Sequence, residues 1–309
     1  MRKIAFVFPG QGAQYIGMGQ DFYEQSAASR EVFDLAAQVT GIDIPALCFE
    51  ENENLNITEY TQIAMLATEA AILAAVRERG IRSQVNAGLS LGEYGALVAS
   101  EVLSPEDAFR VVRRRGILMQ EAVPTGGAMA AVIGMDGERI AEICSRTEGI
   151  VSVANYNCPG QIVITGEEGA VALASEAMKE AGARRIVSLN VSGPFHSQML
   201  QGAGEELAKV LADIPVQEIQ TPYITNVTAD YVKDKKEVKG LLARQVSSSV
   251  KWQQSVERML ADGVDTFVEI GPGRTLSGFL RKIDRSAAGV QIEKFADLDK
   301  AASMLLEEE

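Results

Sequence analysis

The segment Gly88-Leu89-Ser90-Leu91-Gly92 is the part of the sequence with the clearest chemical signal. It fits the G-x-S-x-G pattern, in which a strand turns sharply into a helix and exposes the serine on a strained turn. At the start of that helix, the main-chain N–H of Leu91 would be free to stabilise an oxyanion. Because the chain contains 28 glycines, a chance match is the alternative. The strand expected at 84–88 and the helix expected from residue 91 are the context that the motif requires, so we predict that Ser90 is a nucleophile.

His196 is the only histidine of the chain. A serine hydroxyl is a poor nucleophile without a base, so a histidine base can only be this residue. The ordinary explanation of a single histidine is a surface or core position. Here, Gly193-Pro194-Phe195 comes immediately before it, at the junction between two expected parts of the fold, where a cleft would form. We therefore predict that His196 is the base.

Arg115 stands on the apolar side of the helix expected at 105–122. Residues three and four apart share a helix face, which places Arg115 within the apolar stripe and leaves Arg113 and Arg114 outside it. A buried guanidinium needs an anion, because an unpaired buried charge is very costly. Two partners remain open: a carboxylate of this chain, or a substrate carboxylate bound through two hydrogen bonds. The stripe consists of Ala108, Val111, Val112, Leu118 and Met119.

A glycine-containing loop, residues 9–19, follows the first expected strand. It does not match a dinucleotide-binding fingerprint, because Tyr15 occupies the place of the third glycine. It does not match a phosphate-binding loop either, because Gly17 is followed by Met18 and Gly19 rather than by Lys and Ser or Thr. The loop is either a plain tight turn or the source of main-chain N–H groups for the second half of an oxyanion hole.

These residues must be positioned by elements that alternate through about the first 120 residues, which is typical of a layered α/β domain. Apolar residues lie nearly all round the helix expected at 61–79, so we expect that helix to be buried. Strands are expected at 3–8 and 84–88, and helices at 21–39, at 61–79, from 91, and at 105–122.

The pattern changes at Val123-Pro124-Thr125-Gly126-Gly127, a segment rich in residues that interrupt regular structure. The elements that follow have the order β-α-β-β-α-β, which is the ferredoxin-like pattern. We predict a catalytic part made of residues 1–124 and 195–309, with a small ferredoxin-like part, residues 125–194, inserted into it. The elements of the insert are strands at 128–133, 151–155, 161–166 and 185–191 and helices at 137–146 and 167–181.

The composition is that of an ordinary globular protein, with 47% hydrophobic and 23% charged residues among 309. A formal net charge of −13 disfavours non-specific binding to nucleic acid or to an anionic membrane, because both need a basic face. We expect neither nucleic acid nor a membrane as a partner.

The cysteines and the apolar segments indicate a cytoplasmic location. The apolar run at 4–8 is too short for a signal peptide, and the mostly apolar stretch at 63–76 is too short to span a bilayer. Three cysteines with no metal-type spacing predict neither a metal site nor a disulfide framework, which fits the reducing cytosol. They are Cys48, Cys144 and Cys158.

Together, these motifs make the chain similar, over essentially its whole length, to malonyl-CoA:acyl carrier protein transacylases and to the related acyltransferase domains of polyketide and fatty acid synthases. Gly10-Gln11-Gly12-Ala13-Gln14 resembles the family's GQGxQ loop. The resemblance implies that the main-chain N–H of Gln11 joins that of Leu91 in the oxyanion hole. Ser90 matches the nucleophile of the family, and His196 matches its base.

The remaining motifs of the family also occur in order. Arg115 matches the arginine that binds the malonyl carboxylate. Gln245, ahead of Val250-Lys251-Trp252, matches a glutamine whose main-chain carbonyl orients the histidine in place of an acid. Asn155 and Asn157 belong to a segment that matches a loop lining the cleft. Residues 269–273, Glu-Ile-Gly-Pro-Gly, match a C-terminal loop that we interpret as structural.

The chain departs from the family at Leu89, where many members have histidine just before the nucleophile. That histidine is not the base of the family, so the implied mechanism is unchanged. Phe195 matches a residue that polyketide acyltransferases associate with malonyl rather than methylmalonyl groups. The implied fold is an α/β-hydrolase-like large subdomain with an inserted ferredoxin-like small subdomain.

The resemblance implies a ping-pong transfer of malonyl from malonyl-CoA to the pantetheine thiol of acyl carrier protein, which supplies chain-extension units for fatty acid synthesis. It implies a monomer that uses no metal or cofactor, since the coenzyme A thioester is a substrate. Three alternatives remain: a stand-alone acyltransferase of a polyketide synthase, a serine hydrolase, and a non-catalytic module that binds malonyl-CoA. The serine hydrolase is disfavoured because Arg115 would have no obvious role in it.

Overall fold

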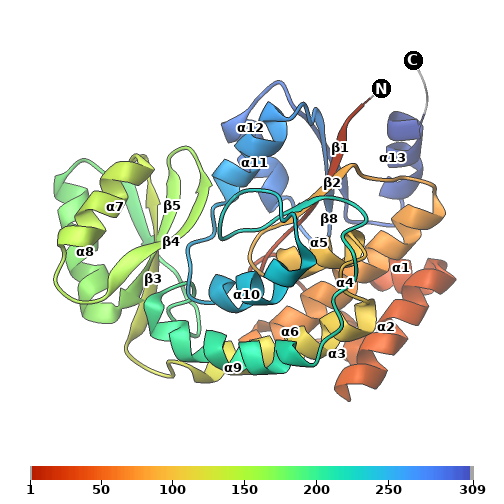
Figure 1. The fold of residues 1–309 in the computed structure, drawn as a ribbon, viewed down its shortest axis with the longest axis horizontal. Helices are drawn as coiled ribbons and strands as arrows, with labels where there is room; N and C mark the ends of the chain where they lie inside the picture. The colour runs from red at the N-terminus through yellow and green to blue at the C-terminus, as the bar shows by residue number, and fades with distance from the viewer. Residues whose placement is uncertain (1, 307–309) are drawn as a thin grey trace.

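The computed structural model describes residues 2–306, and its larger part is built on a five-stranded parallel sheet (Figure 1). The strand order is β7-β2-β1-β8-β9. β1 (Ile4–Phe8) pairs with β2 (Val85–Gly88) on one side and with β8 (Thr266–Ile270) on the other. β7 (Tyr223–Ile224) and β9 (Ala288–Ile292) form the edges. Since neighbouring strands are parallel, the segments that follow β1 and β2 emerge side by side.

Helices cover both faces of this sheet, because successive side chains of each strand point to opposite faces. One face packs against α4 (Thr58–Glu78) and α5 (Gly92–Ala99). The other packs against α11 (Trp252–Ala261) and α12 (Thr275–Ile283). From β1, the first face takes Ile4, Phe6 and Phe8, and the second takes Ala5 and Val7.

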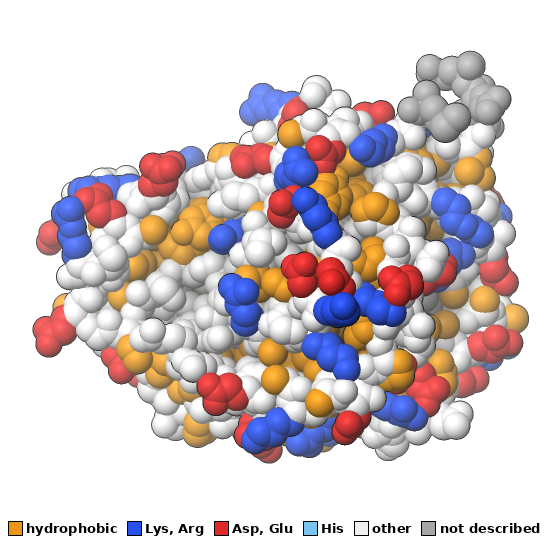
Figure 2. All heavy atoms as spheres, viewed as in Figure 1, with side chains coloured by type: hydrophobic (Ala, Val, Ile, Leu, Met, Phe, Trp, Pro, Cys, Tyr) orange, Lys and Arg blue, Asp and Glu red, His pale blue; other side chains and the backbone are white. Residues whose placement is uncertain are grey.

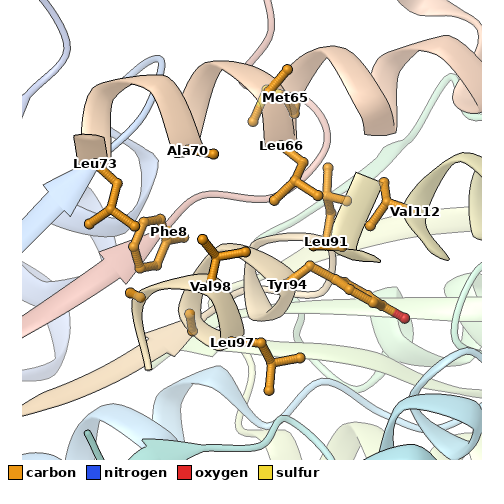
Figure 3. Packing of buried hydrophobic residues seen from close by; sticks show 14 of the residues in the cluster. Phe8, Met65, Leu66, Ala70, Leu73, Leu91, Tyr94, Leu97, Val98 and Val112 are labelled. Atoms are coloured by element: carbon orange, nitrogen blue, oxygen red, sulfur yellow. The ribbon is translucent and has the colours of Figure 1, made fainter. Parts of the chain in front are cut away.

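α4 is buried over most of its length, as its all-round apolar sequence predicts. Figure 3 shows its side chains from Met65 to Leu73 above Phe8 of β1 and the apolar residues of α5. Leu66 has no exposed surface, so its replacement by alanine would cost about 2–5 kcal/mol of stability. This packing holds α5, and with it the turn that precedes α5, against the sheet.

The smaller part is a four-stranded antiparallel sheet in the order β4-β5-β3-β6, seen at the left of Figure 1. Two helices pack on one face of it and share its apolar core. This topology confirms the β-α-β-β-α-β pattern and the predicted fold class. Its elements are β3 (Gly127–Ile133), α7 (Gly137–Arg146), β4 (Val151–Cys158), β5 (Gln161–Glu167), α8 (Glu168–Glu180) and β6 (Arg185–Ser188).

Main-chain hydrogen bonds join the two parts. The N–H of Val250 donates to the carbonyl of Ala154 at 2.8 Å, and the N–H of Tyr156 donates to the carbonyl of Val250 at 2.9 Å. The hydroxyl of Ser249 also donates to the carbonyl of Val153 at 2.5 Å. The segment that contains Val250 therefore extends the small sheet at its β4 edge and fixes that edge to the large part.

The helix predicted at 21–39 is wrong, because the structure has two helices there: α1 (Gln20–Gln25) and α2 (Ala27–Thr40). Ser26 lies between them with an extended backbone, φ −121° and ψ 121°. Its side chain accepts a hydrogen bond from the N–H of Ser29, which is the geometry of a helix N-cap. The cap starts a new helix and ends the first.

The strand predicted at 185–191 is too long, since β6 ends at Ser188. Beyond Leu189, the chain leaves the sheet and lines the cleft described below. The boundaries at 124/125 and 194/195 stay a prediction. On the first side, α6 (Pro105–Glu121) precedes β3, and on the second, the 3₁₀-helix η2 (Gln198–Leu200) follows β6.

Within residues 2–306, no helix is both long and apolar enough to cross a membrane. Cys48, Cys144 and Cys158 are buried free thiols. The remaining helices are α3 (Ile44–Phe49), η1 (Asn54–Asn56), α9 (Gln201–Ala212), α10 (Lys235–Gln245) and α13 (Asp297–Leu306).

Candidate active site

The turn between β2 and α5 carries Ser90 in a left-handed backbone conformation, φ 54°. Such a conformation costs an L-residue about 1–3 kcal/mol, so the surrounding structure must enforce it. A Cβ on Gly88 would lie 1.9 Å from the main chain of Gly92, and a Cβ on Gly92 would lie 2.1 Å from the carbonyl oxygen of Phe8. Both glycines are therefore required for the close approach of strand and helix, and the predicted elbow is present.

His196 lies next to the nucleophile, with its Nε2 atom 2.7 Å from Ser90 Oγ. Its Nδ1 atom lies 2.9 Å from the main-chain oxygen of Gln245. A carbonyl oxygen can only accept, so Nδ1 carries the proton and Nε2 is left to accept the proton of Ser90. The histidine backbone is also left-handed, with φ 62°.

Burial, and after it the positive charge of Arg115, lower the pKa of His196 from 6.5 to about 4. The imidazole is therefore neutral at pH 7, which is the form that can act as a base. Its side chain and main chain together are 4% exposed, so solvent water contributes little to its orientation.

Arg115 is 1% exposed and reaches the nucleophile. Nη1 donates to Gln62 Oε1 at 2.7 Å, and Nη2 donates to Gln245 Oε1 at 3.0 Å and to Ser90 Oγ at 3.2 Å. The guanidinium carbon lies 5.5 Å from the centre of the Tyr94 ring. The sequence left two possible partners for Arg115, a carboxylate of this chain or a carboxylate of the substrate. Among residues 2–306, no carboxylate forms an ion pair with Arg115.

Gln245, the last residue of α10, links the base to the arginine. Its main-chain oxygen accepts from His196, and its side-chain oxygen accepts from Arg115. Its side-chain nitrogen donates to Glu93 Oε2 at 2.6 Å and to the main-chain oxygen of Ser90 at 3.0 Å. The resemblance implied only the main-chain contact. The side-chain contacts show that one glutamine holds three parts of the site together.

Two main-chain N–H groups are available as oxyanion donors. Leu91 is the N-cap residue of α5, and Gln11 follows β1. Neither N–H donates a hydrogen bond within the described chain, whereas the Ser90 N–H donates to the side chain of Asn226 at 2.6 Å. The loop and the elbow touch, because a Cβ on Gly10 would lie 2.6 Å from the carbonyl oxygen of Leu89.

A cleft of about 840 Å³ opens above Ser90, between the large sheet and the free face of the small sheet. Asn155 and Asn157 line its wall from β4, and each is 8% exposed. Neither side chain hydrogen-bonds to Ser90 or His196 within the described residues. The structure thus places both asparagines in the wall of the cleft that contains the reacting pair, without a hydrogen bond to either member of it.

The loop at 269–273 has a structural role, because it positions the helix α12 that lines this cleft. The side chain of Glu269 accepts hydrogen bonds from the N–H groups of Leu276 at 2.9 Å and Ser277 at 2.8 Å. These contacts cap the start of α12, whose Thr275 and Phe279 line the cleft.

Sequence reasoning missed Gln62, Glu93 and Asn226, which all contact the residues above. Two of them left a signal, since Gln62 and Glu93 are polar residues within buried helices. Burial raises the pKa of Glu93, and hydrogen bonds from Asn226 and Gln245 oppose that rise. Asn226 follows a two-residue strand and has no comparable signal. Within residues 2–306, no group of His, Cys, Asp or Glu is arranged to hold a metal ion.

Comparison with known proteins agrees with this geometry. The model of the acyl transferase domain family matches residues 5–300. A malonyl CoA-acyl carrier protein transacylase of Bacillus subtilis is 45% identical over 100% of this chain and 99% of its own length. The crystal structure of the malonyl CoA-acyl carrier protein transacylase from Clostridium perfringens is 43% identical, with a TM-score of 0.95 over 98% of this chain and 97% of that one.

A third relative was solved together with a carrier protein. It is a malonyl-transacylase in complex with its type II PKS acyl-carrier protein, 39% identical, with a TM-score of 0.95 over 98% of this chain and 99% of that one. Similarity at this level over whole chains shows the family as well as the fold. The chain therefore belongs to the acyl transferase domain family and, within it, to the malonyl CoA-acyl carrier protein transacylases, and it is an acyltransferase enzyme.

Proposed function

We propose that this protein moves a malonyl group from malonyl-CoA to the pantetheine thiol of an acyl carrier protein, through a malonyl ester of Ser90, and so supplies chain-extension units for fatty acid synthesis. The observation that carries the proposal is the buried guanidinium of Arg115, which forms no ion pair with a carboxylate among the described residues and whose Nη2 atom lies 3.2 Å from Ser90 Oγ. A charge in that position needs an anion, and the free carboxylate of a malonyl group is one.

The first half-reaction forms the ester. His196 Nε2 takes the hydroxyl proton as Ser90 Oγ attacks the thioester carbon. The main-chain N–H groups of Gln11 and Leu91 stabilise the resulting oxyanion. The carbon–sulfur bond then breaks, and the thiolate of CoA leaves with the proton from Nε2. Arg115 binds the malonyl carboxylate, and this contact replaces the hydrogen bond that Arg115 now donates to Ser90.

The second half-reaction runs the same steps with a different thiol. His196 takes the proton of the pantetheine thiol, whose sulfur attacks the carbonyl carbon of the ester. The bond from that carbon to Ser90 Oγ breaks, and the proton on Nε2 returns to the serine. Gln245 keeps the imidazole in the required tautomer, and Asn155 and Asn157 line the cleft that receives the pantetheine arm.

These steps balance without a metal, a redox partner or a prosthetic group, so we propose that the enzyme needs none. We further propose that it works as a monomer in the cytoplasm, with malonyl-CoA and acyl carrier protein as its partners. The second candidate function is malonyl transfer for a polyketide synthase, because one relative was solved in complex with a type II PKS acyl-carrier protein.

The test is the intact mass of the protein after brief exposure to malonyl-, methylmalonyl- or acetyl-CoA, followed by addition of a carrier protein that bears pantetheine. We expect a malonyl adduct on Ser90, no adduct on Ser90→Ala, and transfer of the malonyl mass to the carrier. Release of free malonate in place of transfer would identify a hydrolase. A bound ligand without release of CoA would identify a binding module.

A further inference from the structure

The side chain of Asn226 contacts the main chain on both sides of Leu89. Its Oδ1 atom accepts the N–H of Ser90 at 2.6 Å, and its Nδ2 atom donates to the carbonyl oxygen of Gly88 at 2.6 Å. The orientation of the amide is determined by its partners, because a main-chain N–H can only donate and a carbonyl can only accept. Asn226 is fully buried, so water does not compete for these bonds.

The bond from Asn226 gives the strained turn an acceptor for the N–H of Ser90, which the turn itself does not provide. Two main-chain bonds close the turn, from the N–H of Gly92 to the carbonyl of Leu89 and from the N–H of Glu93 to the carbonyl of Ser90. Within the described chain, the N–H of Ser90 itself has no acceptor other than Asn226. A buried N–H without an acceptor is destabilising, and this cost would add to the strain of the left-handed backbone.

Asn226 is itself held in place by main-chain contacts. Its N–H donates to Glu93 Oε2 at 3.0 Å, and its carbonyl accepts from the N–H of Lys251 at 3.1 Å. The same oxygen of Glu93 accepts from Gln245 Nε2 at 2.6 Å. One buried carboxylate in the first turn of α5 thus connects Asn226 to the glutamine that contacts His196 and Arg115.

We propose that Asn226 is a positioning residue for acyl transfer, which holds the left-handed main chain of Ser90 by a two-point contact with the elbow. The contact occupies the N–H of Ser90, while the N–H of Leu91 at the start of α5 has no acceptor within the described chain. The inference rests on the proposed function, because it concerns the geometry of the same nucleophile. Asn226 does not touch the acyl group, so it acts on the rate and not on the choice between acyl groups.

The first test compares Asn226→Ala with Asn86→Ala. Asn86 is an equally buried asparagine in β2, whose side chain bonds to Ser100 at 2.8 Å and to Ser83 at 2.7 Å and not to the elbow. Asn226→Ala should slow the formation of malonyl-Ser90 about 100-fold per folded molecule, the scale of a small misplacement of a reacting group. Asn86→Ala should lower stability but keep the wild-type rate of acylation.

The ratio of malonyl to acetyl transfer separates this role from that of Arg115. It should be unchanged in Asn226→Ala, and both half-reactions should slow together. If Asn226→Ala acylates as fast as Asn86→Ala while the wild type forms malonyl-Ser90, this inference is wrong and the proposed function stands. If the wild type forms no malonyl-Ser90, the proposed function fails first.

The variant Asn226→Asp provides a second test that does not depend on the alanine variant folding. A protonated aspartic acid has one donor and one acceptor, as the amide has, but the ionised form has lost the donor to Gly88. The titratable groups that face it are Glu93 and, beyond Gln245, Arg115 and His196. Two neighbouring buried carboxyls keep one of them protonated to higher pH.

We therefore expect the acylation rate of Asn226→Asp, divided by that of the wild type, to be highest near pH 5.5 and to fall at least about tenfold toward pH 8.5, the consequence of losing about 1.4 kcal/mol. The fraction of folded protein, measured by circular dichroism at each pH, corrects the rates. A ratio that does not change with pH would show that the donor to Gly88 has no part in positioning Ser90.

Discussion

The main-chain carbonyl oxygen of Gln245 accepts a hydrogen bond from Nδ1 of His196 at 2.9 Å. In many serine enzymes, a carboxylate occupies this place and stabilises the imidazolium that forms during catalysis. The neutral carbonyl of Gln245 orients the imidazole ring, but it stabilises the charged imidazolium less than a carboxylate would. An imidazolium that is poorly stabilised returns its proton readily, which suits a reaction whose leaving group is a thiolate.

The pH dependence of acylation should report this environment. Burial and the charge of Arg115 lower the pKa of His196 from 6.5 to about 4, and only the neutral ring is a base. The rate of CoA release from malonyl-CoA should therefore stay level as the pH falls from about 8 to about 5.5, and decline only as the pH approaches 4. Stopped-flow measurement of free thiol would show this profile.

His196→Ala is the control for that profile, since it should be slower by about 10²–10⁴ and lack the decline. A midpoint near 6.5 in the wild type would show that the ring is solvated before the substrate binds.

Arg115→Ala should discriminate between acyl groups. Malonyl transfer should lose at least about 1.5–3 kcal/mol, the range for a hydrogen bond to a charged group, while acetyl transfer is spared or improved. The matched control is Arg114→Ala, one residue earlier on the exposed side of α6, which should leave both rates unchanged. Equal losses for malonyl and acetyl groups in Arg115→Ala would instead show a structural role within the network of Gln62 and Gln245.

Glu69 should make the protein less stable as the pH rises. It is fully buried in α4, and neither carboxyl oxygen has a hydrogen-bond partner within the described chain. Burial raises its pKa well above 4.5, so the folded state keeps a proton that the unfolded chain releases above pH 4.5. The resulting loss of stability begins near pH 4.5 and grows until the folded-state pKa is reached.

Glu69→Gln removes that titration. The difference in unfolding free energy between Glu69→Gln and the wild type, from urea denaturation, should shift in favour of the variant between about pH 5 and pH 8, by at least the 1.4 kcal/mol that one pKa unit represents. A difference that is independent of pH would mean that Glu69 is ionised in the folded protein.

The carrier protein presents an electrostatic problem, because acyl carrier proteins are typically acidic and this chain has a net charge of −13. Acidic and basic side chains are interspersed on the face shown in Figure 2, so an attractive patch must be local. Two clusters of basic residues could provide it. They are Lys233, Lys235, Lys236 and Lys239, and Arg281, Lys282 and Arg285.

The second cluster contacts the wall of the cleft. Lys282 at the end of α12 donates to Gln161, a residue of the cleft wall, at 2.9 Å. In the first cluster, Lys235 already pairs with Glu218 at 2.5 Å. Reversal of Arg281 and Arg285 to glutamate should raise the KM for the carrier and flatten its salt dependence, while the KM for malonyl-CoA moves much less.

Reversal of Lys233 and Lys236, which are exposed on the first cluster, is the matched control. If neither pair of reversals changes carrier transfer, the carrier must dock through other surfaces nearer the cleft.

Much of the site could be predicted because local spacing encodes it. The glycines around Ser90 specify a close strand-to-helix turn, and the three- and four-residue spacing of apolar residues specifies which face of α6 is buried. Arg115 could be placed on that face without any knowledge of its neighbours. The β-α-β-β-α-β order likewise indicated the small sheet. The break at Ser26 escaped prediction because the apolar pattern continues through it and only the capping bond ends the helix.

Tertiary structure decided which of these residues meet. Ser90 is 106 residues from His196, 136 from Asn226 and 155 from Gln245, and no spacing rule spans such distances. Only the packing of α4, α6 and the end of α10 around the elbow determines that Arg115 is held by amides instead of a carboxylate. A hydrogen bond depends on distances of a few tenths of an ångström, and the sequence determines those only through the folding of the whole chain.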